Sequence, residues 1–135
     1  MRPNDGRVVS NFIVQALAGK PLTIYGEGSQ TRSFCFVSDL INGITALLSA
    51  PPSEEMAKPF NIGNPEERTV RDLALKILAL TGSPSPIETR DLPVDDPHVR
   101  CPDITRASKT LGWRPEVGID RGIRSTIEYF RKLPS

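Results

Sequence analysis

The chain has 135 residues, of which 38% are hydrophobic and 6% aromatic, enough for one domain with a modest core. Its 17 basic and 16 acidic residues leave a net charge of +1, so no bulk charge favours nucleic acid or a membrane surface. No apolar run approaches the roughly 20 residues that span a bilayer, and the start lacks the apolar core of a signal peptide. Cys35 and Cys101 have no metal-ligand spacing. We therefore expect a cytoplasmic protein with reduced cysteines, without nucleic-acid or membrane partners, in which any anion site is local.

Hydrophobic periodicity and turn residues predict a short alternation of helices and strands. Helices are expected over residues 7–18, 38–48, 69–80, 103–111 and 119–132, and strands over 22–25, 33–37, 60–64 and 87–91. Helix caps are expected at Asn4 or Asp5, Ser38 or Asp39, Thr69 and Asp103, and helix ends at Gly19 and Gly82. Strands so few and short cannot form a full doubly wound sheet. We expect an α/β fold in which residues 1–135 form one small lobe that leans on a partner domain.

The same periodicity predicts which side chains face the core. The inward positions are expected at Leu40, Ile44, Leu47 or Leu48, Val70, Leu73, Ile77, Leu80, Trp113, Tyr129 and Phe130.

The segment 22–39 is the most informative part of the sequence. It reads as a strand, a turn with Gly26 and Gly28, a second strand and a helix start, with Arg32 directed out of the turn. An aromatic ring (Tyr25), backbone N–H groups and a guanidinium at one edge suit a base joined to a phosphate. The alternatives are a surface Arg32 paired with Glu27 or Asp39, and a Tyr25 that is simply a half-buried strand aromatic.

A second arginine, Arg100, stands in a Pro- and Asp-rich segment over residues 83–102. Flanking prolines stiffen the backbone there, so Arg100 could be aimed at an anion, or could equally pair with Asp95, Asp96 or Asp103. The only histidine, His98, has no partner motif and is read as a loop residue. Gly-x-Gly-x-x-Gly, Walker, Tyr-x-x-x-Lys, Ser-His-Asp and metal-cluster patterns are all lacking. The residues alone predict anion recognition without a reaction centre.

Several runs resemble UDP-glucuronate decarboxylase (UDP-xylose synthase), an extended short-chain dehydrogenase/reductase. The resemblance covers essentially the whole chain. Tyr25-Gly, Gln30-Thr-Arg and Leu111-Gly-Trp are shared with sugar-nucleotide dehydratases and epimerases. More specific to the decarboxylases are Asn4-Asp-Gly-Arg-Val-Val-Ser-Asn, Asn64-Pro-Glu-Glu, Asp95-Asp-Pro and Arg100-Cys-Pro-Asp-Ile.

The resemblance implies a fold and a substrate. It implies the small C-terminal substrate-binding lobe of such an enzyme, with short strands, about five helices and no Rossmann NAD domain. That family uses NAD to oxidise the sugar at C4, so that the C5 carboxylate leaves as carbon dioxide, and the reduced cofactor then gives UDP-xylose. Substrate-binding positions are implied at Arg7, Leu22, Thr23, Tyr25, Gln30, Arg32 and Arg100.

Arg100 is also implied to act in the decarboxylation, but no residue of this chain is expected to be the catalytic base. The resemblance places NAD and the Tyr-x-x-x-Lys base in a missing N-terminal domain, so we expect a piece of a longer enzyme that is inactive alone. Homodimerisation is implied for the full-length enzyme only. Two other interpretations stay open. The chain could come from a 4,6-dehydratase or 4-epimerase, or it could be a stand-alone nucleotide-binding module.

Overall fold

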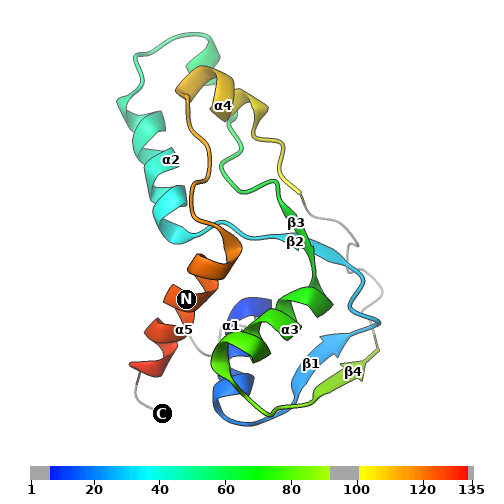
Figure 1. Cartoon of the computed structure of the whole chain (residues 1–135). Coiled ribbons are helices and arrows are strands. Elements are labelled where there is room, and N and C mark those ends of the chain that lie inside the picture. The colour runs from blue at the N-terminus through cyan, green and yellow to red at the C-terminus, as the bar shows by residue number, and fades with distance from the viewer. Residues whose placement is uncertain (1–6, 92–100, 134–135) are drawn as a thin grey trace. The chain divides into compact units, whose positions relative to one another are not determined.

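The computed structural model describes residues 7–91 and 101–133 (Figure 1). Within these ranges the chain forms two compact units. The first comprises residues 7–31, 68–91 and 120–133, and the second comprises residues 32–67 and 101–119. The organisation of residues 1–135 as one domain stays a prediction. The expected α/β class, with five α-helices and short strands among the described residues, is confirmed.

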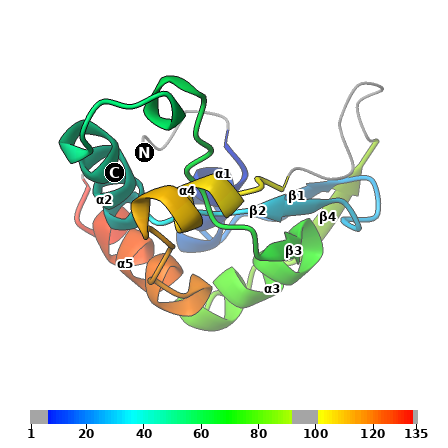
Figure 2. The same cartoon turned by 90° about the horizontal axis from the view of Figure 1, so that it is seen from above.

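The first unit is built on two parallel strands. β1 (Leu22–Tyr25) pairs with β4 (Ile87–Arg90) in a register that aligns Leu22 with Ile87 and Tyr25 with Arg90, and Figure 2 shows the two strands side by side. α1 (Val8–Leu17) and α3 (Val70–Thr81) pack on β1 and on each other, and α5 (Ile119–Arg131) completes the unit. The buried core side chains of this unit are Phe12, Ile13, Ala16, Leu22, Ile24, Val70, Leu73, Ala74, Ile77, Ile123, Ile127 and Phe130.

Local sequence signals explain both ends of α3. The Thr69 hydroxyl accepts from the backbone N–H of Asp72 at 3.1 Å, which confirms the predicted N-cap. Gly82 ends the helix at a φ of 66°, the left-handed conformation that glycine adopts without a steric penalty.

The second unit contains α2 (Val37–Ser49), a short 3₁₀ helix η1 (Glu55–Ala57) and α4 (Thr105–Leu111). Its buried centre is formed by Trp113, Ala107, Asp39 and Gly43. Arg106 lies over the Phe60 ring, with its guanidinium carbon 5.7 Å from the ring centroid. Because the Trp113 side chain is buried, the prediction that it is a core residue is confirmed.

The remaining strands are β2 (Thr31–Ser33) and β3 (Glu67–Thr69), which form a separate two-stranded sheet. The chain passes from one unit to the other within these two strands. β2 was expected over residues 33–37, and that boundary is wrong because α2 already begins at Val37. The strand expected over residues 60–64 is also wrong. The strand of this region is β3, which directly precedes α3.

Three predicted helix starts also differ from the structure. α1 begins at Val8 with Arg7 as its N-cap residue, and α2 begins at Val37 after Phe36, neither with a side-chain cap. The Asp39 carboxylate instead binds elsewhere in the second unit. α4 begins two residues after Asp103, although the Asp103 carboxylate still accepts from the Thr105 N–H at 2.9 Å. The caps expected at Asn4 or Asp5 lie outside the described residues.

Some side chains predicted to face the core are exposed. Leu40, Ile44 and Leu48 are 37%, 42% and 82% exposed, and Tyr129 is 48% exposed. In α2 the buried face is instead the one that carries Asp39 and Gly43. None of the helices in the described ranges has the length and apolar character that crossing a bilayer requires.

Candidate nucleotide site

The glycine-rich turn follows β1 and has two residues in the left-handed region, Gly26 at a φ of 68° and Gly28 at 76°. Gly26 donates its N–H to the Arg90 carbonyl at 2.6 Å, which extends the pairing with β4 by one residue. Gly28 is closely packed. A Cβ there would lie 2.9 Å from Ile24 Cγ2 and 3.0 Å from Arg71 Cβ. Position 28 requires both a left-handed backbone conformation and the absence of a side chain, and only glycine provides the two together.

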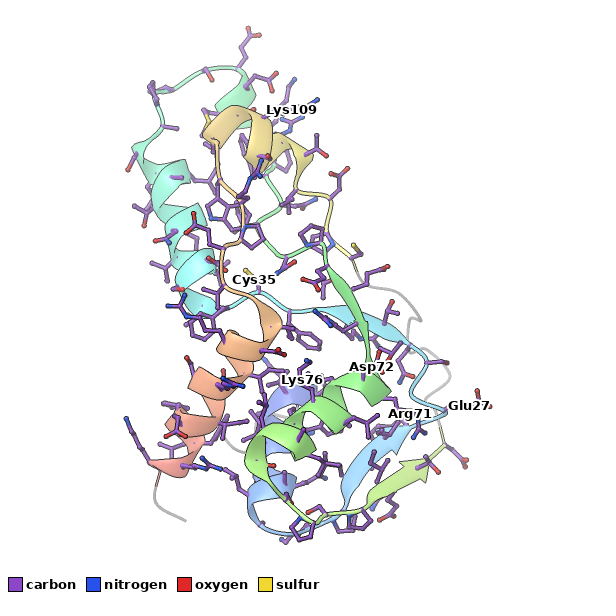
Figure 3. The ribbon with its side chains drawn as sticks, viewed as in Figure 1. Glu27, Cys35, Arg71, Asp72, Lys76 and Lys109 are labelled. Carbon is purple, nitrogen blue, oxygen red and sulfur yellow. The ribbon has the colours of Figure 1, made fainter. Side chains whose placement is uncertain are left out.

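The start of α3 holds the turn in place. Arg71 donates its backbone N–H to the Gly28 carbonyl at 3.1 Å and its Nε–H to the Glu27 carbonyl at 3.0 Å. Figure 3 shows Arg71 at the start of α3 beside Glu27. Val70 donates its N–H to the Gln30 carbonyl at 3.0 Å. Arg71 was not predicted, because its partner is 44 residues away in the sequence. The carbonyls of the turn are thus turned inward to the protein.

One edge of β1 is paired and the other is open. Leu22 and Gly26 donate their N–H groups to the carbonyls of Pro86 and Arg90, on the side of β4. Because successive residues of a strand direct their backbone groups to opposite edges, those of Thr23 and Tyr25 face away from β4. No described strand pairs with that edge.

Two glutamine side chains bracket the open edge. The Thr23 N–H donates to Gln15 Oε1 at 3.2 Å, and Gln15 Nε2 donates to the Thr23 hydroxyl at 3.2 Å. At the other end, the buried Gln30 donates its Nε2–H to the Tyr25 carbonyl at 3.1 Å. The C=O of Thr23 and the N–H of Tyr25 stand between these two contacts. They form an adjacent acceptor and donor for which the described residues provide no hydrogen-bond partner.

The predicted substrate-binding residues occupy different environments. Thr23, Tyr25 and Gln30 meet at the open edge, and Tyr25 is 46% exposed there. Leu22 is fully buried and contributes to the core. Arg32 lies half-buried in β2, and Arg7 is exposed immediately before α1. Arg100 lies outside the described residues, as do Asp95, Asp96 and His98.

Two carboxylates were proposed as alternative partners of Arg32. The Asp39 side chain is 3% exposed and accepts from the backbone N–H groups of Glu116 and Val117, both at 3.0 Å. Glu27 is exposed and its backbone carbonyl accepts from Arg71, which leaves its carboxylate available, so both interpretations of Arg32 stay predictions. Gln15 and Arg71 are the two residues of this region that sequence reasoning missed as part of the site.

A separate cavity of about 840 Å³ lies within the second unit. Its lining includes Glu66, Asp103, Lys109 and Arg114 but none of the predicted substrate-binding residues. Hydrogen bonds from Thr105 lower the pKa of the Asp103 carboxyl below its ordinary value. Nearby in the chain, Cys101 Sγ approaches the Pro65 carbonyl at 3.2 Å. The lining combines acidic, basic and apolar side chains, and this combination does not indicate a particular reaction.

Metal or thiol chemistry finds little support among residues 7–91 and 101–133. These residues contain no cluster of three histidine, cysteine, aspartate or glutamate side chains suited to a metal. Both cysteines are free thiols. Burial, followed by the charge of Asp39, raises the pKa of the Cys35 thiol, which favours its protonated form.

The glycine-rich turn does not fit a dinucleotide cofactor. A dinucleotide-binding turn leads from a strand into a helix, whose N-terminus faces the pyrophosphate. Here the turn leads from β1 into β2, and the space beside Gly28 is filled by Ile24 and Arg71. This turn therefore lacks the strand-to-helix geometry of a dinucleotide-binding turn, and the neighbouring edge of β1 is suited to a flat polar ring.

Comparisons with known proteins identify the family that the chain resembles. The sequence model of the NAD dependent epimerase/dehydratase family matches residues 1–63. UDP-glucuronic acid decarboxylase 1 of Danio rerio is 48% identical over 132 residues, which are 98% of this chain and 31% of that protein. UDP-glucuronic acid decarboxylase 2 of Arabidopsis thaliana is 49% identical, over 96% of this chain and 28% of that protein. The chain thus spans less than a third of the length of these relatives.

Solved structures give the same picture. The UDP-glucuronic acid 4-epimerase from Bacillus cereus, in complex with UDP-glucuronic acid and NAD, superposes with a TM-score of 0.89 at 28% identity, over 98% of this chain and 41% of that one. The UDP-glucose 4-epimerase from Thermotoga maritima, with UDP-glucose, gives 0.88 at 29% identity, over 97% and 41%. This chain belongs to the NAD dependent epimerase/dehydratase family, in which it is similar along nearly its whole length to the UDP-glucuronic acid decarboxylases.

Proposed function

We propose that this chain is the substrate-binding part of an NAD-dependent UDP-glucuronate decarboxylase and that it binds the UDP moiety of the substrate. The identity of 48% over 98% of the chain to a protein of that name supports the reaction class. The observation that carries UDP binding is the open edge of β1, where the Thr23 carbonyl and the Tyr25 N–H, between two glutamines, have no hydrogen-bond partner within residues 7–91 and 101–133.

A uracil ring fits this edge chemically. Its N3–H is a donor and each neighbouring carbonyl is an acceptor, so one imide edge satisfies both backbone groups at once. The exposed Tyr25 ring next to this edge offers an apolar face to the nucleoside. A base bound in this way takes the position of a third strand. The backbone groups of β1 can then form hydrogen bonds with it in the conformation that the strand already has.

The diphosphate is assigned to arginine side chains. Arg32 follows the turn in β2, and the guanidinium forms bidentate bonds with phosphate oxygens. Arg100 and Arg7 are proposed as further contacts from the family resemblance. NAD, when held by another part of such an enzyme, supplies hydride transfer, whereas the residues of this chain bind and orient the nucleotide. We accordingly propose that the chain alone does not turn over substrate.

Titration of the chain with UDP, followed by backbone amide NMR, tests the proposal. Low salt is used because interactions between exposed charges are largely screened beyond about 10 Å at 0.1 M salt, and this distance grows as the salt concentration falls. We expect shifts at the Tyr25 amide and in residues 23–32, whereas residues on the outer face of α5 stay unchanged. A well-dispersed spectrum that does not respond to UDP would refute nucleotide binding by this chain.

A 4-epimerase is the second candidate function, because the two solved structures compared above are UDP-sugar 4-epimerases. Their identity to this chain is 28–29%, well below the 48% of the decarboxylase. The two reactions differ in the fate of the sugar carboxylate. Release of carbon dioxide from UDP-glucuronate by the enzyme that contains this chain supports the decarboxylase, and a 4-epimer that keeps its carboxylate supports the alternative.

A further inference from the structure

We infer that Gln15 is a specificity-determining residue, which selects an imide base such as uracil over cytosine at the open edge of β1. The inference rests on the proposed function, since it concerns which nucleotide that edge accepts. It starts from the paired contacts between the Gln15 amide and Thr23.

The orientation of the Gln15 amide is fixed by chemistry. A backbone N–H can only donate, so the atom opposite the Thr23 N–H must be the amide oxygen. The Nε2 group is then directed to the Thr23 hydroxyl, at 3.2 Å. The amide has two hydrogens on Nε2, and one of them satisfies this contact. The second hydrogen has no acceptor among the described residues.

The position of this donor follows from the strand geometry. The Thr23 N–H points away from β4, so the amide bound to it lies where a third strand would run. A base that binds the Thr23 carbonyl and the Tyr25 N–H occupies the next position along the same edge. The Gln15 amide therefore stands next to that base, on the Thr23 side.

Uracil and cytosine differ in the group that they present to the Gln15 amide. When uracil gives its N3–H to the Thr23 carbonyl and one carbonyl to the Tyr25 N–H, its second carbonyl lies on the Thr23 side and can accept from Gln15 Nε2. Cytosine can satisfy the same two backbone groups with its amino group and N3, but it then presents a C–H toward Gln15. The two backbone groups alone do not discriminate between these bases, and the Gln15 donor does.

The experiment compares UDP with CDP on the full chain and on Gln15→Glu. The carboxylate keeps an acceptor for the Thr23 N–H but removes the Nε2 donor, and its charge acts on both diphosphates alike. The ratio of the two affinities therefore reports the lost hydrogen bond together with the repulsion between the new carboxylate and the uracil carbonyl, and both of these act against UDP. We expect the parent chain to prefer UDP by about 3- to 10-fold, the range of one neutral hydrogen bond, and the variant to lose that preference. Ser125→Asp, which adds the same charge at an exposed position of α5 in the same unit, is the control, and it should leave the ratio of the two affinities unchanged.

A second readout needs no variant and holds even if Gln15→Glu does not fold. One Gln15 Nε2 proton resonance should shift when the parent chain is saturated with UDP, and neither should shift with CDP. A UDP preference unchanged in Gln15→Glu, or Gln15 Nε2 resonances that UDP leaves unmoved, would overturn the role of Gln15 while UDP binding itself stands. If neither nucleotide binds the parent chain, the proposed function fails, and this inference fails with it.

Discussion

Trp113 and Asp39 are joined through the backbone. The indole Nε1–H donates to the Asp39 carbonyl at 3.0 Å, while the Asp39 carboxylate accepts from the N–H groups of Glu116 and Val117. Asp39 thus fixes the segment that follows Trp113 against α2, with all three hydrogen bonds inside the second unit. A carboxylate that is 3% exposed persists there because both of its oxygens are satisfied.

Substitution Asp39→Asn should destabilise the second unit by about 1–3 kcal/mol, because an amide nitrogen would then face a backbone N–H and leave a buried donor unpaired. Urea unfolding followed by the fluorescence of the single tryptophan measures this directly. The exposed Asp91 provides the control, and Asp91→Asn should leave the midpoint unchanged. Equal midpoints for Asp39→Asn and the parent would contradict the structural role of the carboxylate.

Gly43 is required by close packing in the same unit. A Cβ at this position would lie 2.6 Å from Ile62 Cγ2 and 3.2 Å from Trp113 Cε2. Gly43→Ala should therefore cost about 1–3 kcal/mol through overpacking, which exceeds the gain of about 1 kcal/mol in helix propensity. Gly118→Ala is the matched control, since its Cβ would meet nothing within 4 Å. If thermal unfolding ranks the two alanine variants equally, the close contact with Ile62 is not present in solution.

Local signals in the sequence predict the first unit well. β1 is found at Leu22–Tyr25, between Pro21 and Gly26, and the cap and end of α3 lie at Thr69 and Gly82, as expected. These boundaries depend on residues within one turn of the chain. The edges of β2 depend instead on its partner β3, about 35 residues later, which no local pattern indicates.

The apolar stripe of α2 shows a different limit. Periodicity correctly groups Leu40, Ile44 and Leu48 on one face, but it does not tell whether anything in the chain covers that face. The described residues instead bury a neighbouring face, where small Gly43 permits close approach and Asp39 satisfies backbone donors. The small size of Gly43 and the hydrogen bonds of Asp39 therefore decide which face of α2 is buried, and the hydrophobic periodicity does not.

Only the part of the candidate site that depends on local sequence signals was predicted. Tyr25 and the glycine turn carry a signal in the sequence itself. Gln15 and Arg71 act through contacts with Thr23 and Glu27 that form only after α1 and α3 pack on β1. The roles of Arg7, Arg32 and Arg100 stay predictions.

The Lys76 and Asp120 pair gives a pH prediction for the first unit. The hydrogen bond from Lys76, seen between α3 and the start of α5, lowers the pKa of the Asp120 carboxyl below its ordinary value, and the charges of Arg124 and Arg68 act in the same direction. Figure 3 shows Lys76 on α3. A folded-state pKa below the unfolded value means that the contribution to stability is present above the unfolded pKa. It is lost as the pH falls through the folded pKa, in the acid range below about pH 4.

Lys76→Met should raise the pKa of Asp120 toward its ordinary value, and added salt should have a smaller effect in the same direction. Carboxyl carbon NMR during a pH titration reports the pKa of this side chain. Lys20→Met removes the same charge from an exposed position of the first unit that does not act on the Asp120 carboxyl, and it should leave the Asp120 titration unchanged. An identical Asp120 titration in Lys76→Met and the parent would rule out the ion pair in solution.

Arg32 provides the sharpest test of the nucleotide proposal that does not depend on the base. Arg32→Ala should weaken UDP binding by about 1.5–3 kcal/mol, the scale of charge-assisted hydrogen bonds, and Arg100→Ala should do the same. Arg32→Lys should recover only part of the loss, because an ammonium keeps the charge but not the planar, bidentate geometry. Isothermal titration with UDP measures each variant.

A general effect of positive charge must be separated from a direct contact. Arg121 is exposed on α5, so Arg121→Ala removes the same charge away from the β1 edge, and it should change UDP affinity little at moderate salt. Uridine, which lacks phosphate, should bind the parent and Arg32→Ala equally, because its base contacts involve only the β1 edge. If UDP affinity is unchanged in both Arg32→Ala and Arg100→Ala, the arginines do not hold the diphosphate. Any remaining nucleotide binding would then be due to the strand edge alone.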